Sequence, residues 1–175
     1  PDLFSAHNNL GLLFRDLNDF ENAINSYQKA IKVKPDHASS HHNLALAYKE
    51  SGKFKKAIEH HEKAIKLEPK NLMHDYYLAN LKKNKLKNNL IKKIIKIIKK
   101  ENLTFNNLAY GNYLLAKQER KNKNYEKELN LLIKGHENFY NLYKKKFDLN
   151  NKYCFDDIHQ IMNGAKIERS NKQSN

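Results

Sequence analysis

The first 69 residues of the chain repeat themselves with a period of 34. A shift by 34 positions places Asn9-Leu10-Gly11 on Asn43-Leu44-Ala45, and Lys29-Ala30-Ile31-Lys32 on Lys63-Ala64-Ile65-Lys66. Small residues, aromatic residues and a closing proline recur at set places in both copies. A fixed period of this length predicts that each copy folds into two helices joined by a turn.

Each recurring residue type has a physical role in such a helix pair. Gly11 and Ala45 fall in the middle of a helix, where glycine lowers helix propensity, so close approach of the second helix is the expected compensation. Alanines on the second helix permit that approach, and aromatic side chains fill the remaining space. Proline ends each second helix because it cannot donate the next helical N–H. We expect these residues to pack the repeats: Leu10, Gly11, Phe14, Phe20, Ala23, Tyr27, Ala30, Pro35, Leu44, Ala45, Tyr48, Phe54, Ala57, His61, Ala64 and Pro69.

These residues and their spacing resemble the tetratricopeptide repeat (TPR) family. The resemblance implies an all-α fold, a right-handed helical-repeat solenoid of antiparallel helix pairs that binds proteins or extended peptides. The first repeat would span residues 4–37 and the second residues 38–71. Pro1-Asp2 has the register of the end of an earlier repeat, so we expect residues 1–3 to be its tail and the chain to be part of a longer protein. The alternative is that Pro1 begins a natural cap.

The register continues after Pro69 with weaker motifs. Leu78-Ala79 fall 34 residues after Leu44-Ala45, which predicts a degenerate third repeat over residues 72–103. Its second helix, residues 86–100, is rich in isoleucine and lysine. An ordinary repeat helix turns its isoleucines to the core, whereas the alternative is a basic surface helix for an anionic membrane or partner. The preserved register favours the core, and it aligns Ile91, Ile95 and Ile98 with Ala57, His61 and Ala64.

A degenerate fourth repeat with a long helix is predicted over residues 108–147. Leu115-Ala116 and Tyr125 keep the spacing of Leu10-Gly11 and Phe20, although Glu128 stands where alanine is expected. Residues 148–175 are predicted to form a short helix and a polar linker.

The second half also resembles the segment that joins TPR arrays to the catalytic domain of bacterial TPR–sulfotransferase proteins. The resemblance covers residues 72–175 and implies that a sulfotransferase domain follows in the full-length protein. No glycine of this chain lies in a phosphate-binding loop at a helix N-terminus, so this stretch is not expected to be an enzyme itself. The degenerate repeat of those proteins is matched at Leu115-Ala116-Lys117, Glu119, Tyr125-Glu126 and Leu129, whereas Glu128 and Gly135 depart from it.

The chain carries 33 Lys and Arg against 19 Asp and Glu, a formal net charge of +14. The arginines are only Arg15, Arg120 and Arg169. Surfaces dedicated to nucleic acids favour arginine interleaved with aromatic residues, so a solvated lysine surface is the preferred interpretation and nucleic acid is not the expected partner. The single Cys154 cannot form an internal disulfide and no apolar run is long enough to span a bilayer, so we expect a cytoplasmic protein.

Asn9 and Asn43 occupy equivalent places on the two first helices. In TPR superhelices of this type such asparagines line a groove, where an amide can both donate to and accept from an extended peptide backbone. The alternative is that these amides bond locally or to solvent. A clamp that other TPRs use for chaperone C-terminal carboxylates is not matched, because Asn8 and Leu12 stand where lysine and asparagine are needed. The candidate groove residues are Asn8, Asn9, Leu12, His42, Asn43 and Leu46.

The histidine pairs His41-His42 and His60-His61 lie on the two helices of the second repeat. Adjacent residues on a helix point about 100° apart, so at most one histidine of each pair could join a metal site. No cysteine or paired acid accompanies them, so neither a metal nor another cofactor is predicted, and His61 is expected to pack. Asp156-Asp157 and His159 lack a nucleophile, so no catalytic residue is predicted.

The sequence therefore predicts a protein- or peptide-binding TPR module, in the context of the N-terminal recruiting arm of a sulfotransferase-like protein. A stand-alone scaffold for the assembly of protein complexes is the alternative. RNA binding by helical repeats is a third and weaker candidate, because the repeats carry no recurring set of base-reading residues.

Overall fold

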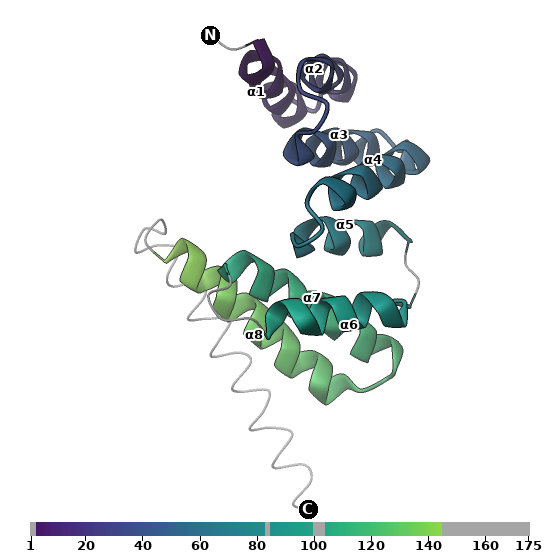
Figure 1. Ribbon diagram of the computed structural model, residues 1–175, viewed down its shortest axis with the longest axis vertical. Coiled ribbons are helices and arrows are strands. Elements are labelled where there is room, and N and C mark those ends of the chain that lie inside the picture. Colours follow the sequence, from purple (N-terminus) through teal and green to yellow (C-terminus); the bar gives the residue numbers. More distant parts are fainter. Residues whose placement is uncertain (1–2, 83–84, 100–103, 145–175) are drawn as a thin grey trace, which may run out of the picture.

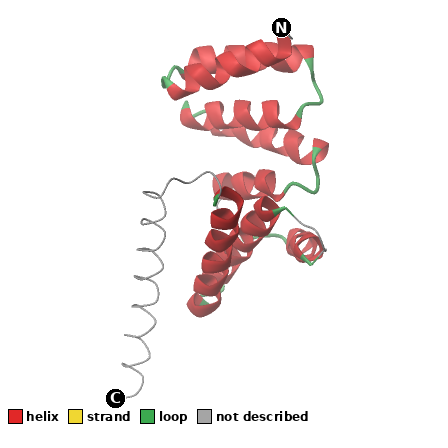
Figure 2. Cartoon of the chain, turned by 90° about the vertical axis from the view of Figure 1, so that its left-hand side faces the viewer, coloured by secondary structure: helices red, strands yellow, loops and turns green. Residues whose placement is uncertain are grey.

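The computed structural model describes residues 3–82, 85–99 and 104–144, and these residues form eight helices and no strand (Figures 1 and 2). The helices stack along the long axis of the molecule, from α1 and α2 at one end to α6, α7 and α8 at the other (Figure 1). This arrangement confirms the all-α helical-repeat fold. The bounds are α1 (Leu3–Asp16), α2 (Phe20–Val33), α3 (Ala38–Glu50), α4 (Phe54–Leu67), α5 (Leu72–Lys82), α6 (Asn88–Ile98), α7 (Phe105–Lys121) and α8 (Tyr125–Tyr143).

The same turn joins the helices of three pairs, α1–α2, α3–α4 and α7–α8. Its left-handed residue is Asn18, Gly52 or Lys123, with φ of 59°, 75° and 61°. The N–H of the next residue donates to the carbonyl five residues back, which satisfies an acceptor at the helix end. Lys123 lies as far beyond Leu115 as Asn18 lies beyond Leu10. The turn therefore supports the register proposed for a fourth repeat, whose exact limits remain a proposal.

Close approach of helices explains the small residues of the first two repeats. A Cβ at Gly11 would lie 2.5 Å from the ring of Tyr27, so glycine is what allows this ring to lie against α1. In the second repeat Ala45 and His61 take the places of Gly11 and Tyr27, and both are fully buried. Most of the predicted packing residues are buried: Gly11, Ala23, Tyr27, Ala30, Leu44, Ala45, Tyr48, Ala57, His61 and Ala64. Phe14 and Phe20 are half-buried.

Four predicted packing residues are exposed instead. Leu10 is 43% exposed, whereas its counterpart Leu44 is buried with residues of α2. The described chain has no helix before α1 that could cover Leu10 in the same way. Phe54, at the start of α4, is 57% exposed and lines a pocket. Pro35 and Pro69 stand two residues beyond the ends of α2 and α4, so they end these helices without packing between them.

The third helix pair departs from the geometry of the first two. The main neighbour of α6 is α7, not α5. Ile94 and Ile97 are buried, which confirms that the apolar stripe of α6 lies in the core. Ile95, which stands 34 residues after the buried His61, is 37% exposed, so it does not occupy an equivalent buried place. The reason is that α6 turns toward α7, where a Cβ at Gly111 would lie 2.5 Å from Ile98.

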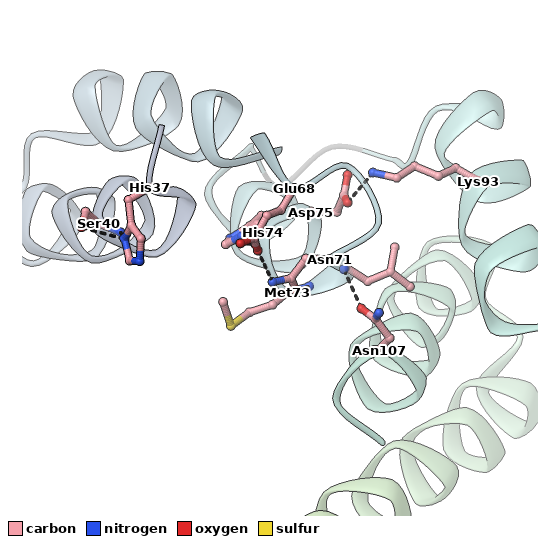
Figure 3. A network of polar contacts seen from close by, with 10 residues as sticks. His37, Ser40, Glu68, Asn71, Met73, His74, Asp75, Lys93 and Asn107 are labelled. Atoms are coloured by element: carbon pink, nitrogen blue, oxygen red, sulfur yellow. Dashed lines mark hydrogen bonds and ion pairs between the residues drawn. The ribbon is translucent and has the colours of Figure 1, made fainter. Parts of the chain in front are cut away.

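Two polar contacts tie α5 to the helices that follow it (Figure 3). Asp75, only 6% exposed, accepts from Nζ of Lys93 in α6 at 2.6 Å. The backbone N–H of Leu72 donates to Oδ1 of Asn107 in α7 at 2.9 Å, and so satisfies one of the free donors at the start of α5. Helix α5 is thereby the junction between the two regular pairs and the remainder of the described chain.

None of the described helices is both long and apolar enough to cross a membrane. The short helix and linker predicted for residues 148–175 lie outside the described residues, and so do Cys154, Asp156, Asp157 and His159.

Candidate functional site

The predicted groove residues of α1 and α3 differ in how far they face solvent. Asn9 is exposed, and Asn43 is half-buried. The side chain of Asn8 is already engaged, because its Oδ1 accepts from Oγ of Ser40 at 3.3 Å. Leu12 and Leu46 are half-buried, and Leu12 packs against the core of the first two repeats. An amide row of Asn9 and Asn43 therefore remains a prediction for the first half of the chain.

His42 is not a groove residue, which corrects the prediction made from its register. It is only 6% exposed, and its ring centroid lies 5.3 Å from those of His61 in α4 and His74 in α5 and 4.8 Å from that of Tyr77. We call His42, His61 and His74 the histidine cluster. Burial lowers the pKa of His42 to about 3 and that of His61 to about 4, so the cluster is neutral at pH 7. It packs three helices together.

His41 of α3 and His60 of α4 lie outside the histidine cluster and are held together by a hydrogen bond. Nε2 of His41 lies 2.9 Å from the carbonyl oxygen of Pro35, so this nitrogen carries the proton. Nδ1 of His41 is then an acceptor, and Nδ1 of His60, 3.0 Å away, donates to it. Burial lowers the pKa of His60 to about 4, in keeping with two neutral rings. Among the described residues no group of three or more histidine, cysteine or acidic side chains is arranged to hold a metal ion.

The repeat register leads from the predicted groove positions to a hollow in the second half. The positions of Asn8 and Leu12 recur 34 residues apart as His42 and Leu46 and then as Tyr76 and Asn80. In α7, with the offset that relates Leu10 to Leu115, the same positions are Tyr113 and Lys117. Two pockets meet along this row. One, of about 620 Å³, lies between α5, α7 and α8. The other, of about 670 Å³, lies beside the start of α4.

Both pockets are lined in part by Tyr76 and Asn80, so they adjoin at these two side chains. We call the two adjoining pockets together the α5 groove. It is lined chiefly by Lys49, Phe54, Tyr76, Tyr77, Asn80, Leu81, Tyr113, Lys117, Lys121, Leu132 and His136.

Tyr113 is held in place by α8. A Cβ at Gly135 would overlap the ring of Tyr113, so the glycine leaves the space that this ring occupies. The ring stacks on Phe139 at 5.7 Å between centroids, and its hydroxyl lies 3.2 Å from Nδ1 of His136. Burial raises the pKa of Tyr113 to about 12, so the phenol stays neutral. The wall of the α5 groove is thus a fixed aromatic surface with a polar edge.

The charged residues of the α5 groove are mostly basic. Nζ of Lys117 donates to the carbonyl oxygen of Ala79 at 2.6 Å and to Oδ1 of Asn80 at 2.9 Å, and both acceptors are neutral. Burial, together with the nearby charge of Lys121, lowers the pKa of Lys117. Glu128 is the carboxylate in the 620 Å³ pocket, and Arg120 is paired with it. This pairing explains how a glutamate is buried where the repeat pattern expects alanine.

Tyr76, Asn80, Tyr113 and Lys117 were absent from the groove predicted from the sequence. The register itself would have found them, because Tyr76 and Asn80 stand 34 residues after His42 and Leu46. Tyr113 and Lys117 are found in the same way if about three inserted residues before α7 are taken into account, and the sequence pattern already indicates that insertion. The signal for these four residues is therefore present in the sequence, in the register of the degenerate repeats.

Two family models match the chain between residues 11 and 71. Residues 11–52 match the family model described as TPR repeat, and residues 38–71 match the one described as tetratricopeptide repeat. Residues 11–71 therefore carry tetratricopeptide repeats. The matched residues include the end of α1, from Gly11, and all of α2, α3 and α4, and neither match extends into α5 to α8. A search of curated proteins found no match.

Solved TPR structures share the fold over most of the chain. The crystal structure of MamA is 17% identical, with 82% of this chain and 81% of that chain covered and a TM-score of 0.56. Residues 41 to the end of MamA from Desulfovibrio magneticus RS-1 are 15% identical, with 97% of each chain covered and a TM-score of 0.55. At these identities the likeness concerns the fold alone.

Proposed function

We propose that this chain is a protein-binding TPR scaffold that holds an extended segment of a partner in the α5 groove. The observation that supports the proposal is the row of first-helix positions from Tyr76 and Asn80 to Tyr113 and Lys117, which borders a hollow with aromatic walls and polar groups. Concave sites of this kind combine apolar area with a few placed hydrogen-bonding groups. The same helices that bury the core present these side chains, so the groove is formed before a partner arrives.

Asn80 offers the sharpest test, because it is exposed and borders both pockets. Peptides would first be selected from an unbiased display library with the full chain as target. Asn80→Trp should fill the groove and reduce affinity for a selected peptide at least tenfold, measured by fluorescence anisotropy. Asn25→Trp, at an exposed position of α2, is the matched control and should leave the affinity unchanged. Equal affinities of the two variants would contradict peptide binding in the α5 groove.

A second pair of substitutions tests the amide row of the first half. If Asn9 and Asn43 contact the same peptide, Asn9→Ala with Asn43→Ala should weaken binding while the melting temperature stays nearly unchanged. If the affinity does not change, the peptide site is confined to the α5 groove and the amide row has no part in it.

The recruiting arm of a sulfotransferase-like protein is the finer form of this proposal. It is supported only by the resemblance of residues 72–175 to the segment before the catalytic domain in such proteins, with Lys117 and Tyr125 among the matching positions. An array that holds an acceptor near a catalytic domain raises the effective concentration of that acceptor. Sequencing the coding DNA beyond Asn175 tests this directly. More 34-residue repeats, or a stop codon, would leave a stand-alone scaffold.

RNA remains the competing class of partner because of the net charge of +14. Binding to phosphates weakens steeply with salt, so affinity for an oligonucleotide would fall by orders of magnitude between low and physiological salt. Peptide binding that depends little on salt, with no competition from the oligonucleotide, would exclude RNA. A cytoplasmic location stays a prediction from the cysteine content.

A further inference from the structure

Lys117 is a half-buried cation without a carboxylate partner among the described residues. Its ammonium has three N–H donors, and the structure assigns acceptors to two of them, the Ala79 carbonyl and the Asn80 side chain. Neutral acceptors leave the charge itself uncompensated. A cation in that position interacts more strongly with an incoming anion than a fully solvated surface lysine does, because less water screens it.

The surroundings of Lys117 add positive charge. The same 620 Å³ pocket includes Lys121 and Arg120, and its carboxylate, Glu128, is already paired with Arg120. Lys49 lies in the adjoining pocket of the α5 groove. Three lysines therefore face a hollow in which the described chain places no free carboxylate. Charge complementarity at a groove of this kind selects partners and steers them toward it.

The walls beside these lysines are aromatic. The ring centroids of Tyr76 and Tyr113 lie 5.9 Å apart, and Leu132 and His136 of α8 complete the lining. Such walls favour an apolar or aromatic side chain next to the anion. One half-buried ammonium suits one discrete carboxylate, whereas a nucleic-acid strand is bound by cations spread along its backbone.

We infer that the pocket between α5, α7 and α8 binds an aspartate or glutamate side chain of a partner protein's extended segment, through Lys117 and Lys121, with a neighbouring apolar side chain of that segment against Tyr76 and Tyr113. This inference rests on the proposed peptide binding in the α5 groove and specifies the chemistry of the peptide. It differs from capture of a chain's terminal carboxylate, because an internal acidic residue is sufficient.

The test uses the full chain and peptides selected from the unbiased library. We expect the selected peptides to be enriched in Asp or Glu next to an aromatic or aliphatic residue. Replacing the acidic residue of the best peptide by its amide should lower affinity at least about tenfold, since an unpaired half-buried charge is then left behind. Lys117→Gln with Lys121→Gln should remove the preference for the acid over the amide. The control, Lys29→Gln with Lys32→Gln, changes two exposed lysines of α2 and removes the same amount of charge. It should leave the preference for the acid over the amide unchanged.

Several outcomes would overturn the inference. Selected peptides without acidic enrichment, whose binding is nevertheless blocked by Asn80→Trp, would leave the proposed peptide binding in place and refute the acidic partner. If Lys29→Gln with Lys32→Gln removes the preference for the acid over the amide equally, that preference arises from net charge and not from Lys117 and Lys121. If Lys117→Gln lowers the melting temperature strongly, Lys121→Gln alone, at an exposed position, is used for the comparison.

Two other occupants are distinguished by the same assay. Asp156→Asn with Asp157→Asn removes two acids of the chain's own last residues. A tenfold gain in peptide affinity would show that these two acids of the chain itself occupy the pocket, and it would refute an acidic residue of a partner protein as the occupant. A single-stranded oligonucleotide that binds more tightly than the peptide, and loses that affinity with Lys117→Gln, would identify nucleic acid instead.

Discussion

Gly11 and Tyr27 show how a single pair of residues sets the distance between two helices. The ring of Tyr27 occupies the space that a side chain at Gly11 would need. The second repeat solves the same contact with Ala45 and the smaller ring of His61, both fully buried. A larger residue on one helix is thus matched by a smaller one on the other, as close-packed interiors require.

Gly11→Ala should therefore destabilise the chain although alanine is the better helix former. The gain in propensity is about 1 kcal/mol, and overpacking against the ring costs about 1–3 kcal/mol. The measurement is urea unfolding followed by circular dichroism. Gly11→Ala combined with Tyr27→His, which copies the second repeat, should recover part of the loss. A double variant no more stable than Gly11→Ala would show that the ring contact is not the cause.

At the scale of elements, the histidine cluster joins α3, α4 and α5 without ionic contacts of its own. His61 is fully buried, and among the described residues neither of its ring nitrogens has a hydrogen-bond partner, nor does Nδ1 of His42. Nε2 of His74 lies 3.3 Å from a carboxylate oxygen of Glu68, yet burial still lowers the pKa of His74. The packing of three helices therefore depends on rings that stay neutral.

This dependence predicts a loss of stability in mild acid. The pKa values of His42 and His61, about 3 and about 4 in the folded chain, lie below the ordinary value of 6.5. The unfolded chain then binds more protons below pH 6.5, so the stability present above that pH falls as the pH drops toward 4. Each tenfold difference in proton affinity corresponds to about 1.4 kcal/mol. Urea midpoints measured between pH 7.5 and 4.5 would show the decline.

The control for this prediction is His61→Leu, which removes one buried titrating ring from the cluster. Its stability should depend less steeply on pH than that of the unchanged chain. Parallel curves for the two proteins would mean that the acid sensitivity arises elsewhere, for example from carboxylates.

At the scale of the whole molecule, the described residues form two hydrophobic cores. One lies between α2, α3 and α4 and includes Leu44 and Tyr48, while the other joins α5, α6 and α7 and includes Ile94 and Leu114. Helix α5 contributes Leu81 to the edge of the first core and Leu72 to the second. In solenoids each unit contacts only its neighbours, so stability is distributed along the array.

Cavities in the two cores should consequently have local effects. Leu44→Ala and Leu114→Ala each remove a fully buried side chain, at a cost of about 2–5 kcal/mol. Hydrogen exchange read by mass spectrometry should show faster exchange chiefly in α2 to α4 for the first variant and in α5 to α7 for the second. Uniform acceleration over the whole described chain in both variants would indicate one cooperative unit.

The repeat period by itself determined the helix pairs, their turns and most of the core of the first half. These features depend on local signals, such as a residue suited to positive φ at the turn and small residues at the crossing, and such signals recur with the sequence. The sequence also predicted that the isoleucines of α6 lie in a core.

Only the tertiary structure decided which helix α6 packs against and where the groove lies. Isoleucines stand in α6 at the places that Ala57 and Ala64 occupy in α4, so the close crossing that alanines permit is not available, and α6 packs against α7 instead. His42 kept its register but was buried by rings from two other helices. Lys117 contacts Asn80, 37 positions away in the sequence, only because α5 and α7 lie side by side. Contacts between distant residues of this kind depend on packing, which a periodic pattern in the sequence does not record.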